Sequence, residues 1–523
     1  MMPLRFLMIV CMAAGMAAAQ TNCPASTHPA GSARWNGWAD AANTRFQSSK
    51  EAGLTPQTAA KLKFKWAFGF PGVTNAEGVP TVFDGRVFVG AADGNVYALD
   101  ARTGCAYWSY QAAAGVRVAP LVDESGRSVY FGDLKANMYA VDVASGHLLW
   151  KALADEQPMA VITGSPKLQG GRLYVPISGR DESMAARDPS FECCKFRGSV
   201  VALDAGTGKR IWQAYTIVEE PKVTGKNAKG TRMWGPSGAV PWSSPTLDVA
   251  KRVLYIGTGV NYSEPATNTS DALLAFDMDS GKLLWSHQFT GEDAYNFACV
   301  GKDKTNCPKS PFIDADFGSS GILRSLANGQ RILVLSDKSG TVYGVDPDQR
   351  GKLLWKRRVA GGGVNGGFMW GGASDEQSMA YLGISDYTAG KPEVGGGLVA
   401  LQLATGERLW MTPAPKPGCI GTTGCSAAQP APVTAIPGVA FLGSWDGHIR
   451  AYATGHNGAK PGAILWDFDT TREFPTVNGV KAHGGSINSM GPVPAGGMLY
   501  VTSGYPGSGM PGNVLLAFSV DGR

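Results

Sequence analysis

The stretch ALDARTGCAYW at residues 98–108 contains the pattern AxDxxxGxxxW, which recurs along the chain. A unit that repeats every few tens of residues is typical of an array of similar supersecondary units. Three further copies are AVDVASGHLLW (140–150), ALDAGTGKRIW (202–212) and AFDMDSGKLLW (275–285), and looser copies end at Trp355, Trp410 and Trp466.

Each copy follows a stretch in which every second residue is apolar, as in GRVFVGAADGNVYALD at residues 85–100. Such alternation, broken by an Asp-Gly turn, predicts a small antiparallel meander. The tryptophan ends the outer part of the unit, where its flat ring can fill the gap to the next unit. The Asp and Gly residues shape the preceding turn.

An eighth copy is divided between the two ends of the chain. The segment VLLAFSVDGR at residues 514–523 supplies its first half, and LKFKWAF at residues 62–68 supplies Trp66. Pairing of the two segments would close a ring and leave no free edge strand. The sequence therefore predicts an all-β fold, an eight-bladed β-propeller of four-stranded antiparallel blades, as a single domain over residues 20–523.

The spacing of the tryptophans shows where loops are inserted. From Trp66 onward they are 42, 42, 62, 73, 70, 55 and 56 residues apart. The longer intervals predict loops on a rigid scaffold, which is where functional residues concentrate. These loops are residues 178–197, 219–241 and 291–316.

Composition and the amino terminus indicate an exported protein. Arg5 precedes an apolar run at residues 6–14 and then small residues to Ala19, which predicts a signal peptide at residues 1–19 and a periplasmic or secreted location. The run is too short for a membrane span. The net charge of +5 is small and spread along the chain, which argues against nucleic-acid binding.

Cleavage would remove Cys11 and leave eight cysteines, an even number that favours disulfides in an exported chain. Two pairs close short loops, Cys299 with Cys307 and Cys419 with Cys425. Cys23 and Cys105 are left as a longer-range pair. Adjacent Cys193 and Cys194 either form a vicinal ring or join two separate structural disulfides. No CxxCH motif is present, so no haem site is predicted.

The repeat, the opening segment WNGWADAANTRFQ (35–47) and the closing segment SGYPGSGMPGNVLLAFSVDG (503–522) resemble the propellers of quinoprotein alcohol dehydrogenases, most closely the polyvinyl alcohol dehydrogenases. Non-enzymatic propellers of outer-membrane assembly share the repeat alone. More discriminating are ECCKFRGSVVALD (192–204), WGPSGAVPWSSPTLD (234–248) and GEDAYNFACVGKDKTNCP (291–308).

The resemblance implies that pyrroloquinoline quinone binds at the propeller axis. It implies Trp242 as the floor beneath the planar ring, Cys193 with Cys194 as a cap, and Arg197 and Lys338 as partners of its carboxylate or quinone oxygens. The alternatives are a packing tryptophan at 242 and a simple turn lysine at 338.

The resemblance also implies a calcium ion and a catalytic base. Glu182 is the candidate first ligand, but Val260 stands where relatives have asparagine, so Asn261 would have to replace it by way of a bulge. Relatives use an aspartate in a segment that ends with Asn296 here, which leaves Asp293 as the expected base and Glu292 as its alternative.

The leading hypothesis is a quinone-dependent oxidoreductase that oxidises secondary alcohols, possible substrates being polymers such as polyvinyl alcohol. Electrons would pass to an external cytochrome c or another acceptor. The competing hypotheses are a non-catalytic interaction scaffold of the cell envelope and a quinone-binding protein without turnover.

Overall fold

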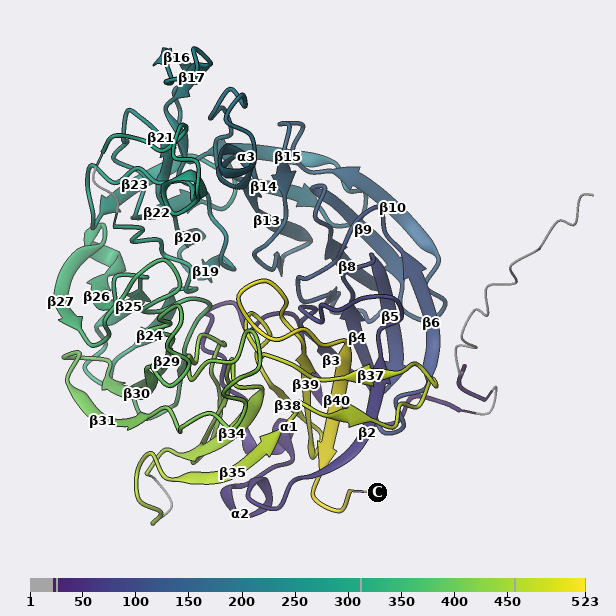
Figure 1. Cartoon of the computed structure of the whole chain (residues 1–523). Helices are drawn as coiled ribbons and strands as arrows, with labels where there is room; N and C mark the ends of the chain where they lie inside the picture. The colour runs from purple at the N-terminus through teal and green to yellow at the C-terminus, as the bar shows by residue number, and fades with distance from the viewer. Residues whose placement is uncertain (1–21, 25–26, 311–312, 456–457, 523) are drawn as a thin grey trace, which may run out of the picture.

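The computed structural model describes residues 22–24, 27–310, 313–455 and 458–522. In this part of the chain, eight antiparallel sheets surround a central axis (Figure 1), so the predicted eight-bladed β-propeller is confirmed. The predicted signal peptide, residues 1–19, lies outside the described residues.

The blades follow one another in chain order. The first four consist of β3 (Thr81–Phe83), β4 (Arg86–Gly90), β5 (Asn95–Asp100) and β6 (Ala106–Gln111); β7 (Leu121–Val122), β8 (Ser128–Gly132), β9 (Asn137–Asp142) and β10 (Leu148–Leu153); β12 (Lys167–Gln169), β13 (Arg172–Gly179), β14 (Ser199–Asp204) and β15 (Arg210–Tyr215), with β11 (Ala160–Val161) also on β13; and β19 (Thr246–Asp248), β20 (Val253–Gly257), β22 (Ala272–Asp277) and β23 (Leu283–Gln288).

The other four complete the ring. They consist of β24 (Ile322–Ser325), β25 (Arg331–Ser336), β26 (Thr341–Asp346) and β27 (Lys352–Arg358); β28 (Ala373–Ser374), β29 (Met379–Ile384), β30 (Gly397–Gln402) and β31 (Arg408–Pro413); β32 (Thr434–Ile436), β33 (Val439–Gly443), β34 (His448–Ala453) and β35 (Ile464–Asp469); and β38 (Val493–Ala495), β39 (Met498–Ser503), β40 (Val514–Ser519) and β2 (Lys63–Gly69).

The eighth blade joins the two ends of the chain. Strand β2 pairs antiparallel with β40 in the register Ala67 to Leu516 and Gly69 to Val514, and the two strands lie side by side in Figure 1. The predicted ring closure is therefore confirmed, and the edge that an open ring would expose is paired.

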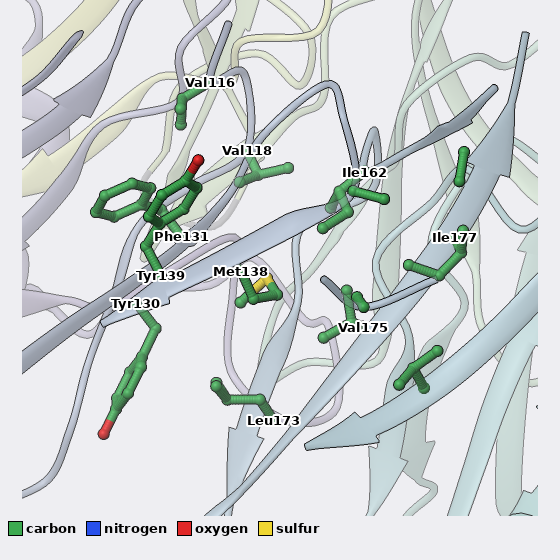
Figure 2. Close-up of a cluster of buried hydrophobic side chains, with 14 of the residues drawn as sticks. Val116, Val118, Tyr130, Phe131, Met138, Tyr139, Ile162, Leu173, Val175 and Ile177 are labelled. Atoms are coloured by element: carbon green, nitrogen blue, oxygen red, sulfur yellow. The ribbon is translucent and has the colours of Figure 1, made fainter. Parts of the chain in front are cut away.

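Apolar side chains fill the space between neighbouring blades. Between the second and third blades, Met138 of one sheet faces Leu173 and Val175 of the next (Figure 2), and all three are fully buried. Phe131, on the opposite face of the second blade, packs against Tyr110 of the first blade with ring centroids 5.9 Å apart. The alternation that predicted the strands places these residues on the buried faces.

The tryptophans of the repeat dock each blade onto the next. The indole of Trp150 lies against the turn of the third blade and donates its N–H to the Ala205 carbonyl at 2.9 Å. A Cβ at Gly208 in that turn would lie 2.6 Å from the Trp150 ring, and Gly208 has a φ of +71°. Trp108 makes the same contact with Gly146, and Trp212 with Gly281. The girdle packing predicted for these tryptophans is confirmed.

The opening segment touches successive blades in turn at one end of the ring. Strand β1 (Arg34–Trp35) pairs with β3 of the first blade. The segment then bonds successively to the second through seventh blades: Asn36 Nδ2 to the Val122 carbonyl, Lys167 Nζ to the Ala39 carbonyl, Leu247 N to the Ala41 carbonyl, Leu323 N to the Ala42 carbonyl, Ser374 N to the Thr44 carbonyl and Arg45 Nε to the Val433 carbonyl. Helix α1 (Ser49–Ala52), which follows the segment, bonds to the eighth blade through Gly497 N and the Ala52 carbonyl.

Short elements complete the structure. The helices are α1 (Ser49–Ala52), α2 (Pro56–Ala59), α3 (Asp181–Arg187), η1 (Phe297–Cys299) and η2 (Pro347–Gln349), and the two-stranded sheets pair β16 (Lys222–Lys226) with β17 (Arg232–Gly235), β18 (Ser237–Gly238) with β21 (Asn261–Ser263) and β36 (Glu473–Phe474) with β37 (Ala482–His483). Among the described residues, no helix has the length and apolar character needed to cross a bilayer.

We expect Gly208→Ala to destabilise the fold more than Gly170→Ala. Both glycines have positive φ values, +71° and +56°, so each substitution costs roughly 1–2 kcal/mol of backbone strain. Only Gly208 faces an indole, because nothing lies within 4 Å of a Cβ at Gly170. Overpacking against Trp150 should add about 1–3 kcal/mol. Denaturant unfolding of both variants measures the difference, and equal losses would contradict the docking role of the glycine.

Candidate active site

The three inserted loops pack together over one end of the ring. Asn306 of the third loop accepts a hydrogen bond from Asn227 of the second at 2.8 Å. Its own Nδ2 donates to the Ala185 carbonyl of the first loop at 3.1 Å. Asn306 is 1% exposed, so this buried amide holds the three loops as one unit.

A cavity of about 300 Å³ lies between these loops and the blades. Its wall includes Arg117, Thr163, Ser178, Glu182, Trp242, Tyr262, Asp316, Lys338, Asn365, Trp370 and Tyr505. These residues come from the inserted loops and from several blades, so the ring gathers side chains that are far apart in sequence.

Two tryptophans form an apolar part of the wall. The rings of Trp242 and Trp370 have centroids 5.0 Å apart and meet edge to face at 83°. Gly318 lies against Trp242 so closely that a Cβ there would be 1.8 Å from the ring. Trp242 therefore has a fixed place in the cavity, as the floor hypothesis requires, and Trp370 is a second aromatic that sequence reasoning missed.

Lys338 brings a cation to the same wall. It lies in the turn between β25 and β26, with Nζ 5.5 Å from the centroid of the Trp242 ring. The ammonium donates to Asp314 Oδ1 at 2.9 Å and to Asp316 Oδ2 at 2.9 Å. The two carboxylates and burial fix the position of this lysine, so it is more than a solvated turn residue.

Glu182 enters the cavity from helix α3. Burial raises the pKa of its carboxyl to about 8, and the nearby Asp316 acts in the same direction. Lys338 opposes this shift only in part. The wall carries two carboxylates, Glu182 and Asp316, and three cations, Arg117, Arg180 and Lys338.

Three polar atoms in the wall make no hydrogen bond to the described residues. They are Arg117 Nη2, Thr163 Oγ1 and the Tyr262 hydroxyl, each shielded from bulk solvent. Arg117 Nη2 does form an ion pair with Glu77 Oε1 at 3.6 Å. Arg117 also lies over the Trp370 ring, with its Cζ 4.8 Å from the centroid. Buried polar groups are normally satisfied, so these atoms indicate a polar ligand. A planar, anionic quinone fits this combination of aromatic plates, cations and free donors.

The sequence patterns did not indicate Arg117 as a site residue, although its position between two blades places it at the same end of the ring as Lys338. It stands in the stretch GVRVAP, which links the outer strand of the first blade to β7. Such links and the turn that carries Lys338 lie at the same end of the blades, because both precede a strand that runs in the same direction.

Two of the predicted site residues stay outside the cavity wall. Arg197 donates to the Val218 carbonyl at 2.8 Å and lies over the Tyr215 ring at 4.1 Å. Asn261 uses Nδ2 for the Ser237 carbonyl at 2.9 Å and Oδ1 for Thr267 N at 2.7 Å. With both polar atoms engaged, Asn261 is not available to a ligand in the cavity.

The structure contains the disulfides Cys23–Cys105, Cys299–Cys307 and Cys419–Cys425, as predicted, and for Cys193 and Cys194 it shows the vicinal ring rather than two separate disulfides. The vicinal pair is fully buried and belongs to the same packed cluster as Tyr262 and Trp242. It does not line the cavity, so in this structure it supports the wall from behind.

Asp293 also lies behind the wall. Its carboxylate accepts hydrogen bonds from Ile313 N at 3.0 Å and from Ala315 N at 3.3 Å. Burial raises its pKa, and these backbone donors oppose the rise. The side chain is 1% exposed and does not line the cavity.

Comparison with known proteins places the chain in a family. A family model described as outer membrane protein assembly factor BamB matches residues 38–226 and 196–521. Polyvinylalcohol dehydrogenases of Pseudomonas sp. and of Sphingopyxis sp. strain 113P3 are 42% and 40% identical, and each match covers 94% of this chain and 77% of the relative. The chain belongs to the polyvinyl alcohol dehydrogenase family.

This quinoprotein alcohol dehydrogenase family also accounts for the fold. The solved quinohemoprotein alcohol dehydrogenase ADHIIG of Pseudomonas putida superposes with a TM-score of 0.66 at 18% identity, covering 94% of this chain and 80% of that one. The predicted oxidoreductase class is confirmed. Propellers of the envelope-scaffold class share the repeat, but the two polyvinylalcohol dehydrogenases match nearly the whole chain at 40% identity or more.

We expect Glu182→Gln to flatten the pH dependence of stability. The carboxyl has its pKa raised from 4.5 to about 8 on folding, so its contribution is full below 4.5 and is lost as the pH rises through about 8. The variant should lose less stability than the parent between these limits, measured as denaturation midpoints. Exposed Glu124→Gln is the matched control. An unchanged slope in Glu182→Gln would contradict the raised pKa.

Proposed function

We propose that this chain oxidises secondary alcohols, including hydroxylated polymers such as polyvinyl alcohol, with pyrroloquinoline quinone held in the axial cavity. The observation that carries the proposal is a set of polar atoms without hydrogen bonds, two tryptophans and the Lys338 cation on one wall. When bound, the quinone supplies the acceptor for the hydride that leaves the carbinol carbon.

Each residue of the wall contacts a different part of the quinone in this proposal. The face of Trp242 packs against the planar ring, and Lys338 at 5.5 Å from that face lies within reach of an oxygen at the ring edge. Arg117 takes the place proposed for Arg197 as the partner of a carboxylate. Cys193, Cys194 and Arg197 remain in the proposal as residues that hold the wall.

Calcium fits the described residues incompletely. Calcium takes six to eight oxygen ligands, and of the two proposed ligands only Glu182 faces the cavity. No cluster of three or more His, Cys, Asp or Glu side chains suited to a metal occurs in the described part of the chain. We therefore keep Glu182 as the proposed contact for an ion but derive no step from it.

We also propose that the protein is exported and that it passes its electrons to a separate acceptor. Four disulfides support folding in an oxidising compartment, in line with export to the periplasm or medium. The electrons would pass to a separate acceptor such as a cytochrome c.

Reconstitution of the purified chain tests the function. Titration with pyrroloquinoline quinone, followed by absorption, should show binding, and dye reduction should follow with polyvinyl alcohol and small secondary alcohols. Arg117→Ala should weaken quinone binding about ten- to a hundredfold, because a charged hydrogen bond is worth about 1.5–3 kcal/mol.

Arg197→Ala is the matched control, because that arginine bonds to backbone carbonyls away from the cavity. It should change quinone affinity less than Arg117→Ala does. The proposal fails if the parent chain binds no quinone, and the assignment of Arg117 fails if Arg197→Ala has the larger effect.

A further inference from the structure

A second pocket, of about 340 Å³, opens at the same end of the ring as the axial cavity. The turn between β33 and β34 that contributes Asp446 to it occupies the same place in its blade as the turn that carries Lys338, so both pockets face the same side. The wall consists of Gly418, Cys419, Thr422, Asp446, His448, Asp469, Thr471, His483, Gly484, Met510 and Pro511.

A single loop separates this second pocket from the axial cavity. Tyr505 lines the cavity, whereas Met510 and Pro511 of the same loop line the second pocket. The loop is narrow, because Tyr505 N donates to the Met510 carbonyl at 2.9 Å. Beside it, the Trp445 ring stacks on Tyr505 with centroids 5.9 Å apart, and the next residue, Asp446, lines the second pocket. The two pockets are therefore one loop's width apart.

The outer wall of the second pocket is fixed by a disulfide and by backbone contacts. The bond between Cys419 and Cys425 closes the link from β31 to β32 around Thr422. Gly424 of this link packs on the loop of the eighth blade, where an added Cβ would lie 2.3 Å from the Gly509 carbonyl oxygen. Because its walls are held in this way, the pocket is formed before any ligand binds.

Two of the six histidines of the chain line the pocket, and one nitrogen of each ring is engaged. His448 Nδ1 lies 2.5 Å from Asp467 Oδ1, and His483 Nδ1 donates to the Gly484 carbonyl at 2.9 Å. Neither Nε2 makes a hydrogen bond to the described residues. A neutral imidazole that donates through Nδ1 accepts through Nε2, so each ring can accept a hydrogen bond from a hydroxyl group.

The other groups of the wall suit hydroxyl groups better than ions. The buried carboxylate of Asp446 is neutralised by Arg450 at 2.6 Å. Asp469 accepts from both N and Oγ1 of Thr471. Within the described ranges, no three His, Cys, Asp or Glu side chains form a group suited to a metal ion. Met510 adds apolar surface. This combination fits an uncharged carbon chain that bears hydroxyl groups.

We propose that the second pocket is a subsite for a hydroxylated polymer, which it binds while another hydroxyl of the same polymer chain occupies the axial cavity. The inference rests on the proposed function and deepens it. His448 and His483 accept hydrogen bonds from the polymer, and Met510 packs against its carbon chain. A small secondary alcohol fills the axial cavity alone. The subsite therefore gives the polymer binding energy that small alcohols lack.

The test compares a polyvinyl alcohol oligomer with isopropanol in dye reduction by quinone-reconstituted His448→Ala and His483→Ala. Each variant should raise the KM for the oligomer, relative to that for isopropanol, by about two- to tenfold, the worth of one net hydrogen bond. The kcat for the oligomer should stay near that of the parent, because the subsite holds ground state and transition state alike.

Exposed His147→Ala is the matched control. His147 lies in the turn between β9 and β10, at the opposite end of the ring, and its replacement should leave the ratio of the two KM values unchanged. Equal changes in KM for oligomer and isopropanol in both pocket variants, or an effect of His147→Ala as large as theirs, would overturn the subsite.

Calorimetric titration of the quinone-free chain with the oligomer separates this inference from the proposed function. His483 is exposed, so His483→Ala should fold as the parent does and should weaken oligomer binding by the same two- to tenfold factor, about one hydrogen bond. An affinity that neither pocket variant changes would overturn the subsite. A parent chain that binds the oligomer through these histidines but oxidises neither alcohol would support the subsite and overturn the proposed function.

Discussion

The contact of an indole with a glycine in the next blade is the constraint on which the architecture depends. Because no side chain fits between Trp150 and the turn at Gly208, each blade can sit on its neighbour in only one way. Seven such joints determine the curvature of the array, and the pairing of β2 with β40 closes it. Only a closed ring brings Arg117, Glu182, Asp316 and Lys338 to one axis.

The cavity at that axis contains several buried charged side chains that the propeller does not need for its own folding. Lys338 lies between two aspartates and above an indole, and the burial of Glu182 raises its pKa to about 8. Buried charges are costly unless they are paired, so such a cluster is usually retained for a function. The amide of Asn306 locks the inserted loops together at little cost in apolar packing, which keeps these groups in place.

The sequence predicted the ring because its information is local and repeated. Alternation, turns and the tryptophan each recur several times, so a single exception such as Gln402 in place of aspartate does no harm. The site has no such redundancy. Trp242, Lys338 and Glu182 do line the cavity, whereas Arg197 and Asn261 bond elsewhere.

The failures have a common physical origin in side-chain direction. One step along a strand reverses the face, so Asn261 cannot take the position of Val260 without a change in backbone, and its amide is instead held by Ser237 and Thr267. Asp293 and Asp316 sit at opposite ends of one irregular loop, where no periodicity indicates which carboxylate turns inward. The sequence pattern indicates Arg197, beside the paired cysteines, whereas the arginine that lines the cavity is Arg117 from a link between two blades.

The opening segment covers one end of the propeller axis, so the two ends of the cavity differ. Trp38 of this segment and Trp242 of the floor line the same small void of about 20 Å³, together with Ser243 and Thr163. The Trp38 Nε1, Ser243 Oγ and Thr163 Oγ1 atoms have no protein partner among the described residues, and a void of this size holds one water molecule. This segment and helix α1 together bond to all eight blades, so they cover the end of the axis beyond the tryptophan floor. Under the proposed function, alcohol and acceptor approach from the side of the inserted loops, where Asp316 and Lys338 face the cavity.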